Sequence, residues 1–105
     1  MRIVVVDDHE TNRELCRFML NDIAEQFYAF EDGASVVESM KEMSILPDII
    51  ILDVMMPVKD GFETAKDIRR AFPDHHIPIL FLSVLDDKDS YKRCLNLGDD
   101  FIPKP

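Results

Sequence analysis

The sequence has only two cysteines and lacks any motif that would place them around a metal ion. Cys16 and Cys94 lie in segments with helical patterns, and neither has a second cysteine or a histidine at zinc-ligand spacing. The pattern therefore indicates neither a disulfide scaffold nor a zinc site. We expect buried free thiols in a reducing compartment.

Long apolar runs are also lacking. No stretch approaches the roughly 20 apolar residues that are needed to cross a bilayer. A strand pattern begins directly after Met1-Arg2, which leaves no room for a signal peptide. We therefore expect a cytoplasmic protein with no membrane partner.

Positive charge is scarce. The chain has 12 basic and 21 acidic residues, a formal net charge of −9. Since an acidic domain repels phosphate backbones, we expect no direct binding of nucleic acid. The remaining composition is globular, with 47% hydrophobic residues in 105, no repeat and no interdomain linker. It predicts one small domain over residues 1–105.

Short runs of aliphatic residues, each followed by a polar side chain, dominate the pattern. The clearest run is Ile49–Leu52, which ends at Asp53 and is bounded by Pro47 and Pro57. Periodicity alone does not separate a buried strand from a buried helix, but β-branching and the short length favour a strand. Further runs predict strands at 3–6, 26–30, 79–82 and 101–102.

Helical patterns fill the intervals between these runs. The first predicted helix is 9–22, with Leu15, Phe18, Met19 and Ile23 at helical spacing. The second follows a turn or cap at Asp32-Gly33, with Ala34, Val37 and Met40 inward. The third runs from Asp60-Gly61 to Pro73, with Phe62, Ala65, Ile68 and Phe72 on one face, and the fourth follows Asp86 or Asp87, with Tyr91, Cys94 and Leu95 inward. Alternation of buried strands with helices predicts an α/β protein with a parallel sheet covered on both faces. We predict a flavodoxin-like, doubly wound, five-stranded sheet of order 2-1-3-4-5.

Acidic side chains follow two strands that this order makes neighbours. Asp7 and Asp8 follow the first strand and Asp53 follows the third. Carboxylates that converge repel one another, so they need either a bound cation or raised pKa values. A site with oxygen ligands alone suits a hard ion such as Mg²⁺. Because such an ion also neutralises an incoming phosphate, the site suits phosphoryl transfer. Lys104 could supply a fixed positive charge at the same edge, and Ser83 a hydrogen bond. Singly, such residues are commonly caps, turns or exposed side chains, so the prediction depends on their joint occurrence.

The segments VVVDDHETNR, LDVMMPVKDG, LFLSV and DDFIPKP together resemble the receiver domain of two-component response regulators, over the whole chain. The resemblance implies that Asp53 accepts a phosphoryl group from a histidine kinase or phosphotransfer protein. It also implies a Mg²⁺ ion, with Mn²⁺ as an alternative, held by Asp8, Asp53 and the backbone carbonyl of Met55. Asp7 would act through an intervening water.

The same resemblance implies a switch. Lys104 would pair with the phosphoryl group and Ser83 would move towards it, vacating space for the ring of Phe101. The face formed by the fourth helix and the last strand would then change and be recognised by an output domain or target protein. Phe101 could equally be an ordinary core aromatic.

The end of the pattern differs from the family. Receiver domains continue past the Lys-Pro pair into a fifth helix beside the first, and this sequence contains none. The simplest explanation is a receiver domain cut from a longer regulator. In this segment we expect exposed apolar surface, and self-association or a homodimer through it.

Two other functions remain open: a degenerate receiver used only for docking or dimerisation, and a phosphatase with an aspartyl nucleophile. The complete set of Asp8, Asp53, Ser83 and Lys104 argues against the first. Haloacid-dehalogenase-like phosphatases need a second Asp two residues after the nucleophile, where this sequence has Met55. We therefore expect no enzyme beyond catalysis of its own phosphorylation and dephosphorylation.

The three histidines receive no catalytic role from the sequence. His9 follows the acidic pair and is expected to begin the first helix near the rim of the site. His75 and His76 lie in a proline-bounded loop and are expected to be solvated.

Overall fold

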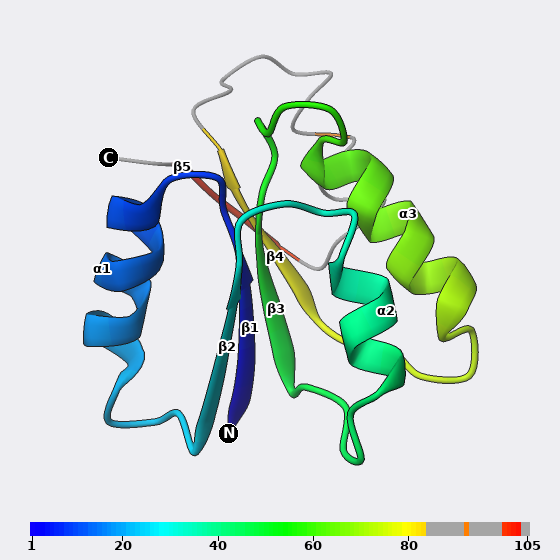
Figure 1. Ribbon diagram of the computed structural model, residues 1–105, viewed down its shortest axis with the longest axis horizontal. Coiled ribbons are helices and arrows are strands. Elements are labelled where there is room, and N and C mark those ends of the chain that lie inside the picture. Colours follow the sequence, from blue (N-terminus) through cyan, green and yellow to red (C-terminus); the bar gives the residue numbers. More distant parts are fainter. Residues whose placement is uncertain (84–91, 93–99, 104–105) are drawn as a thin grey trace.

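The strands form one parallel sheet of five, in the order β2-β1-β3-β4-β5 (Figure 1). The computed structural model describes residues 1–83, 92 and 100–103, and for Ser83 and 100–103 it describes the backbone only. The strands are β1 (Arg2–Val6), β2 (Gln26–Phe30), β3 (Ile49–Asp53), β4 (Ile79–Ser83) and β5 (Asp100–Pro103). The predicted fold class and strand order are confirmed.

Helices lie on both faces of this sheet. Helix α1 (Glu10–Leu20) covers one face, while α2 (Val36–Lys41) and α3 (Gly61–Ala71) cover the other (Figure 1). The helix predicted after Asp86 or Asp87, with Cys94, lies outside the described residues. In the part of the chain that the structure describes, no helix is long and apolar enough to cross a membrane.

The sheet has a core on each face, and alternate residues of a strand belong to different cores. In β1, Val4 and Val6 join the larger core with α2 and α3, whereas Ile3 and Val5 join a smaller one with Ile51 on the α1 side. Burial on both faces explains why the strands have continuous apolar runs rather than alternating ones.

Helix α3 is oriented as the sequence predicts. Phe62, Ala65 and Ile68 are buried, and Phe72 packs against the same core. The side chain of Asp60 accepts a hydrogen bond from the backbone N–H of Glu63, which caps the helix N-terminus. The face of α3 was therefore predictable from apolar spacing alone.

The prediction for the start of the second helix is wrong. Ala34 is exposed, and α2 begins at Val36, which is buried together with Met40. The reason is a turn: Oδ1 of Asp32 accepts hydrogen bonds from the backbone N–H groups of Ala34 and Ser35. An Asp side chain of this kind competes with helix formation locally, so the helix starts later.

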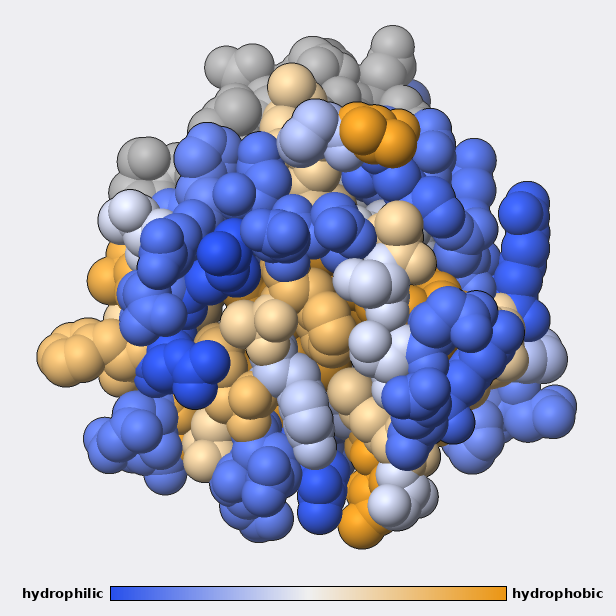
Figure 2. All heavy atoms as spheres, viewed as in Figure 1, coloured by the Kyte–Doolittle hydropathy of each residue, from blue (hydrophilic) through white to orange (hydrophobic). Residues whose placement is uncertain are grey.

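Helix α1 forms as predicted, but its apolar stripe points away from the core. Leu15, Phe18 and Met19 are 48%, 82% and 70% exposed, while Cys16 and Leu20 pack on the α1 side of the sheet. Cys16 is only partly buried, contrary to expectation. Figure 2 shows apolar surface over α1, at the left of the view. Helical spacing places residues on a common face, but it does not say what covers that face.

Candidate functional site

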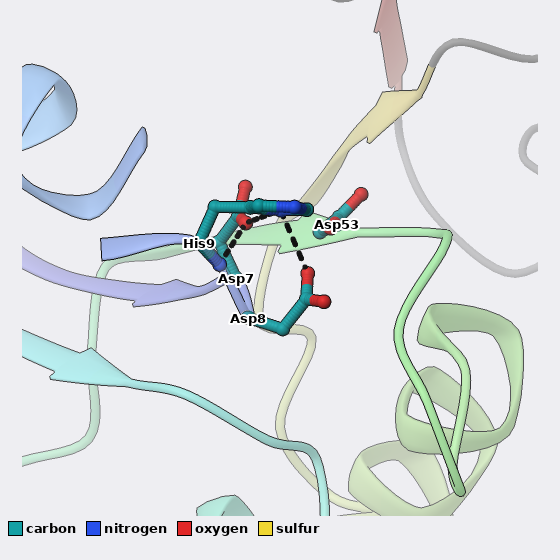
Figure 3. Close-up of side chains that lie close together, drawn as sticks. All are labelled: Asp7, Asp8, His9 and Asp53. Atoms are coloured by element: carbon teal, nitrogen blue, oxygen red, sulfur yellow. Dashed lines mark hydrogen bonds and ion pairs between the residues drawn. The ribbon is translucent and has the colours of Figure 1, made fainter. Parts of the chain in front are cut away.

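Two strand ends bring the acidic residues to one edge of the sheet. Val6 pairs with Leu52 in the parallel register of β1 and β3. Asp7 therefore lies next to Asp53, each at the carboxyl end of its strand (Figure 3). Both residues are 1% exposed, whereas the side chain of Asp8 is 25% exposed. Asp8 is thus the carboxylate nearest to solvent.

The acidic cluster consists of Asp7, Asp8 and Asp53, and His9 lies with it. One ligand atom from each of these four residues lies within 4.8 Å of the others. An octahedral ion with bonds of about 2.1 Å places opposite ligands about 4.2 Å apart. Small shifts would therefore let these atoms share one ion. Because buried carboxylates this close repel one another, the donor set fits a hard divalent cation.

The first turn of α1 positions Asp7. Its Oδ1 accepts a hydrogen bond from the backbone N–H of His9 at 2.9 Å, and its Oδ2 accepts one from the Asn12 amide at 3.3 Å. Arg13 Nη1 donates to the backbone oxygen of Asp7 at 2.8 Å, and the N–H of Asp7 donates to Phe30 O at 3.0 Å. Sequence reasoning missed Asn12 and Arg13. Their place in the first turn after the acidic pair was the available signal.

Asp53 is held by the loop that follows it. Its Oδ1 accepts a hydrogen bond from the N–H of Met55 at 3.2 Å. The N–H of Val54 donates to Leu82 O at 3.0 Å, and the N–H of Gly61 donates to Val54 O at 2.9 Å. These bonds tie the carboxyl end of β3 to both β4 and α3. That Met55 ligates a cation through its carbonyl stays a prediction.

The same loop contains a strained residue and an ion pair. Val58 has φ 68 and a relative exposure of 104%. A β-branched residue rarely adopts positive φ. Lys59 pairs through Nζ with Asp67 of α3, which directs this ammonium group towards the helix.

The structure describes the backbone of Ser83 and Phe101 but not Lys104. Ser83 ends β4, directly after the residue that pairs with Asp53, and it pairs in turn with Pro103. Phe101 pairs with Phe81 in the register of β4 and β5. Lys104 lies outside the described residues, and the roles of Ser83 and Phe101 stay predictions because only their backbone is described.

His9 lies closer to the cluster than the sequence suggested. Its Nδ1 atom is 3.1 Å from Oδ1 of Asp8 and 3.4 Å from Oδ1 of Asp7, and its side chain is 66% exposed. His75 and His76 are exposed, as expected. A histidine after an acidic pair carries no strong signal, because its direction depends on how the helix begins.

Comparison with known proteins identifies related chains. The family model for the response regulator receiver domain matches residues 3–105. Response regulator RR06 of Streptococcus pneumoniae serotype 2 (strain D39 / NCTC 7466) is 35% identical over 106 residues, which cover 100% of this chain and 46% of that protein. The chain thus spans about half the length of this curated relative.

Solved structures agree in fold. Chemotaxis protein CheY4 of Vibrio cholerae has a TM-score of 0.87 at 26% identity, covering 99% of this chain and 86% of that one. The signal receiver domain of a histidine kinase from Syntrophus aciditrophicus has a TM-score of 0.83 at 32% identity, covering 99% and 78%. The receiver domain of the Arabidopsis thaliana histidine kinase CKI1, complexed with Mg²⁺ and BeF₃⁻, has a TM-score of 0.86 at 22% identity, covering 97% and 79%, which shows the fold alone.

Proposed function

The chain belongs to the response regulator receiver domains of two-component signalling, and from this premise we propose that it is a phosphoacceptor module whose acceptor is Asp53. One observation carries the proposal. Asp53 is a buried carboxylate at the carboxyl end of β3, and its ligand oxygen lies within 4.8 Å of those of Asp7 and Asp8. Ligands of open parallel sheets bind at this edge.

The donor is a phosphohistidine of a histidine kinase or phosphotransfer protein. A carboxylate oxygen of Asp53 forms the new O–P bond while the N–P bond of the donor breaks. The imidazole leaves with the electron pair and takes a proton from solvent. The product is an acyl phosphate on Asp53, and later attack by water returns the carboxylate and inorganic phosphate.

Asp8, Asp53 and the backbone carbonyl of Met55 would hold the cation, with Asp7 acting through water. Mg²⁺, or Mn²⁺ in its place, neutralises negative charge on the phosphoryl oxygens when it is bound. What the chain itself contributes to cation binding is an acidic cluster that is already arranged before the ion binds. Asp7 is already fixed by His9 and Asn12, so little ordering remains to be done on binding.

The switch uses the neighbouring strand ends. Lys104 pairs with the new negative charge, and Ser83 donates a hydrogen bond to a phosphoryl oxygen. The displacement of Ser83 makes room for Phe101, which changes the face next to β5. An output domain or separate target protein recognises that face.

This function is signalling and not turnover of an external substrate. Met55 stands where a haloacid-dehalogenase-like phosphatase needs its acid/base Asp, and a thioether cannot transfer a proton. The single domain over 1–105 and the cytoplasmic location stay predictions.

A second proposal concerns self-association. Leu15, Phe18, Met19 and Ile23, all 48% or more exposed, form an apolar stripe on and after α1. On the same face of the sheet, Leu80 and Leu82 of β4 are only partly buried. An apolar surface of this kind favours a homodimer of the chain.

Acetyl phosphate with Mg²⁺, followed by intact mass measurement, tests the phosphoacceptor. We expect the mass of one added phosphoryl group in the wild type and in the exposed control Asp74→Ala, and none in Asp53→Ala. Chelation of Mg²⁺ should abolish the adduct. Failure of a folded wild type to gain the adduct from any donor would favour the docking-only alternative, and repeated hydrolysis of a phosphomonoester would favour a phosphatase.

A further inference from the structure

We propose that Nδ1 of His9 is an additional protein ligand of a cation bound at the acidic cluster of Asp7, Asp8 and Asp53, so that His9 adds affinity for imidazole-seeking metals such as Ni²⁺ that it does not add for Mg²⁺. The inference rests on the cation site of the proposed function. It adds to that site a nitrogen donor, which changes the class of metal that the site accepts.

The position of the ring is the first support. Nδ1 of His9 lies 3.1 Å from Asp8 Oδ1 and 3.4 Å from Asp7 Oδ1. In Figure 3 the imidazole lies over the carboxylate of Asp8 and extends towards Asp53. Adjacent ligands of an octahedral ion with bonds of about 2.1 Å are about 3.0 Å apart. The nitrogen and the Asp8 oxygen are therefore already spaced like neighbouring ligands.

The backbone of His9 is the second support. His9 is the N-cap residue of α1, and its N–H donates to Asp7 Oδ1 at 2.9 Å. Asn12 holds the same carboxylate from the next part of the helix. The backbone of His9 is therefore anchored to the carboxylate of Asp7, which keeps the imidazole beside the acidic cluster. That side chain is 66% exposed, so it has room to rotate.

The chemistry of the donors gives the specificity. Carboxylate, carbonyl and water ligands suit Mg²⁺ and Mn²⁺, whereas imidazole suits Ni²⁺, Cu²⁺ and Zn²⁺. For a given set of nitrogen and oxygen ligands, affinity rises from Mn²⁺ to Ni²⁺ and Cu²⁺. Ni²⁺ is the most informative probe here because it takes nitrogen and oxygen ligands together.

A competing explanation makes the opposite prediction. If His9 only forms ion pairs with Asp7 and Asp8, an incoming cation has to displace it. Removal of the ring would then tighten the binding of Ni²⁺ and Mg²⁺ alike. If His9 is a ligand, its removal weakens Ni²⁺ binding and leaves Mg²⁺ binding nearly unchanged.

Calorimetric titration of Ni²⁺ and Mg²⁺ into the wild type, His9→Ala and His75→Ala distinguishes a metal ligand at His9 from a residue that only forms ion pairs. We expect the Ni²⁺ dissociation constant to rise at least about tenfold in His9→Ala, and to stay unchanged in His75→Ala, which removes an exposed imidazole from the loop before β4. His9→Asn introduces a side chain that caps helices well, and it should lose Ni²⁺ affinity in the same way even if His9→Ala folds poorly.

Acetyl phosphate labelling with Mg²⁺ in the same variants distinguishes the possible failures. Equal Ni²⁺ affinity in the wild type and both His9 variants, with normal labelling of Asp53, would overturn the inference and leave the proposed function intact. Absence of both Mg²⁺ binding and labelling in the folded wild type would overturn both.

Discussion

Gly61 begins α3 directly against the backbone of Asp53. A Cβ atom at position 61 would lie 2.3 Å from the backbone oxygen of Asp53 and 2.8 Å from Cα of Val54. Only the missing side chain allows α3 to approach this closely. The N–H of Gly61, which donates to Val54 O at 2.9 Å, depends on the same approach. The position of Asp53, the proposed phosphoacceptor, is therefore coupled to the identity of a residue eight positions later.

Gly61→Ala should consequently disturb both the fold and the site. We expect it to lower the free energy of unfolding by about 1 to 3 kcal/mol, the usual cost of overpacking, and to weaken Mg²⁺ binding by displacing Asp53. Denaturant unfolding and Mg²⁺ titration measure the two effects. Lys66→Ala, at an exposed position of the same helix, should change neither, and an unchanged midpoint in Gly61→Ala would contradict the close approach.

Val58→Gly should stabilise the protein. Among the described residues, Val58 is the one non-glycine residue with positive φ, at 68, and such strain costs about 1 to 3 kcal/mol. Thermal unfolding should show a higher midpoint, although part of the gain is offset by the greater chain entropy of glycine in the unfolded state. Val58→Ala, which keeps a Cβ atom, is the matched control and should gain less. A lower midpoint in Val58→Gly would mean that Val58 makes stabilising contacts.

Arg13→Ala tests whether Arg13 positions Asp7. Arg13 Nη1 donates to the backbone oxygen of Asp7 at 2.8 Å, and a hydrogen bond from a charged group is worth about 1.5 to 3 kcal/mol. Because Arg13 is partly exposed, we expect a loss of unfolding free energy towards the lower value, with weaker Mg²⁺ binding. Glu14→Ala, on the exposed side of α1, should keep wild-type Mg²⁺ affinity. If Arg13→Ala loses stability without loss of affinity, the contact is structural only.

Phe18→Glu tests the homodimer. Phe18 is 82% exposed on α1, so burial of its ring between two copies would be favourable and a charge there would be costly. Light scattering over a range of concentrations should show a dimer for the wild type and a monomer for Phe18→Glu. Ile45→Glu, at an apolar residue that is 57% exposed outside α1, should remain dimeric. A wild type that stays monomeric at every concentration would refute the proposal.

Much of the fold was predictable because buried parallel strands have a distinctive local pattern. The bounds of β2 were predicted as Gln26–Phe30, and the acidic residues were placed correctly at the ends of β1 and β3. Once the strand order was predicted, Asp7 and Asp53 had to be neighbours. Chain order and the geometry of parallel sheets were enough for that step.

The details of the site were less predictable. Nothing local to His9 shows that its ring turns towards Asp8, and nothing local to Asn12 shows that it holds Asp7. Such contacts depend on where α1 begins and on the rotamer of each side chain. For α2 the sequence predicted a turn or cap at Asp32-Gly33, but not that the hydrogen bonds of Asp32 reach Ser35 and so delay the start of the helix to Val36.

The sequence by itself determined the strands, the acidic residues at the ends of β1 and β3, and the family, because β-branching, continuous apolar runs and motif order are properties of consecutive residues. Only the tertiary structure decided that the stripe of Leu15 and Phe18 faces away from the core, and that His9 joins the acidic cluster. Both depend on which surfaces meet after the strands have paired. That choice is made by packing between distant segments, which local spacing does not specify.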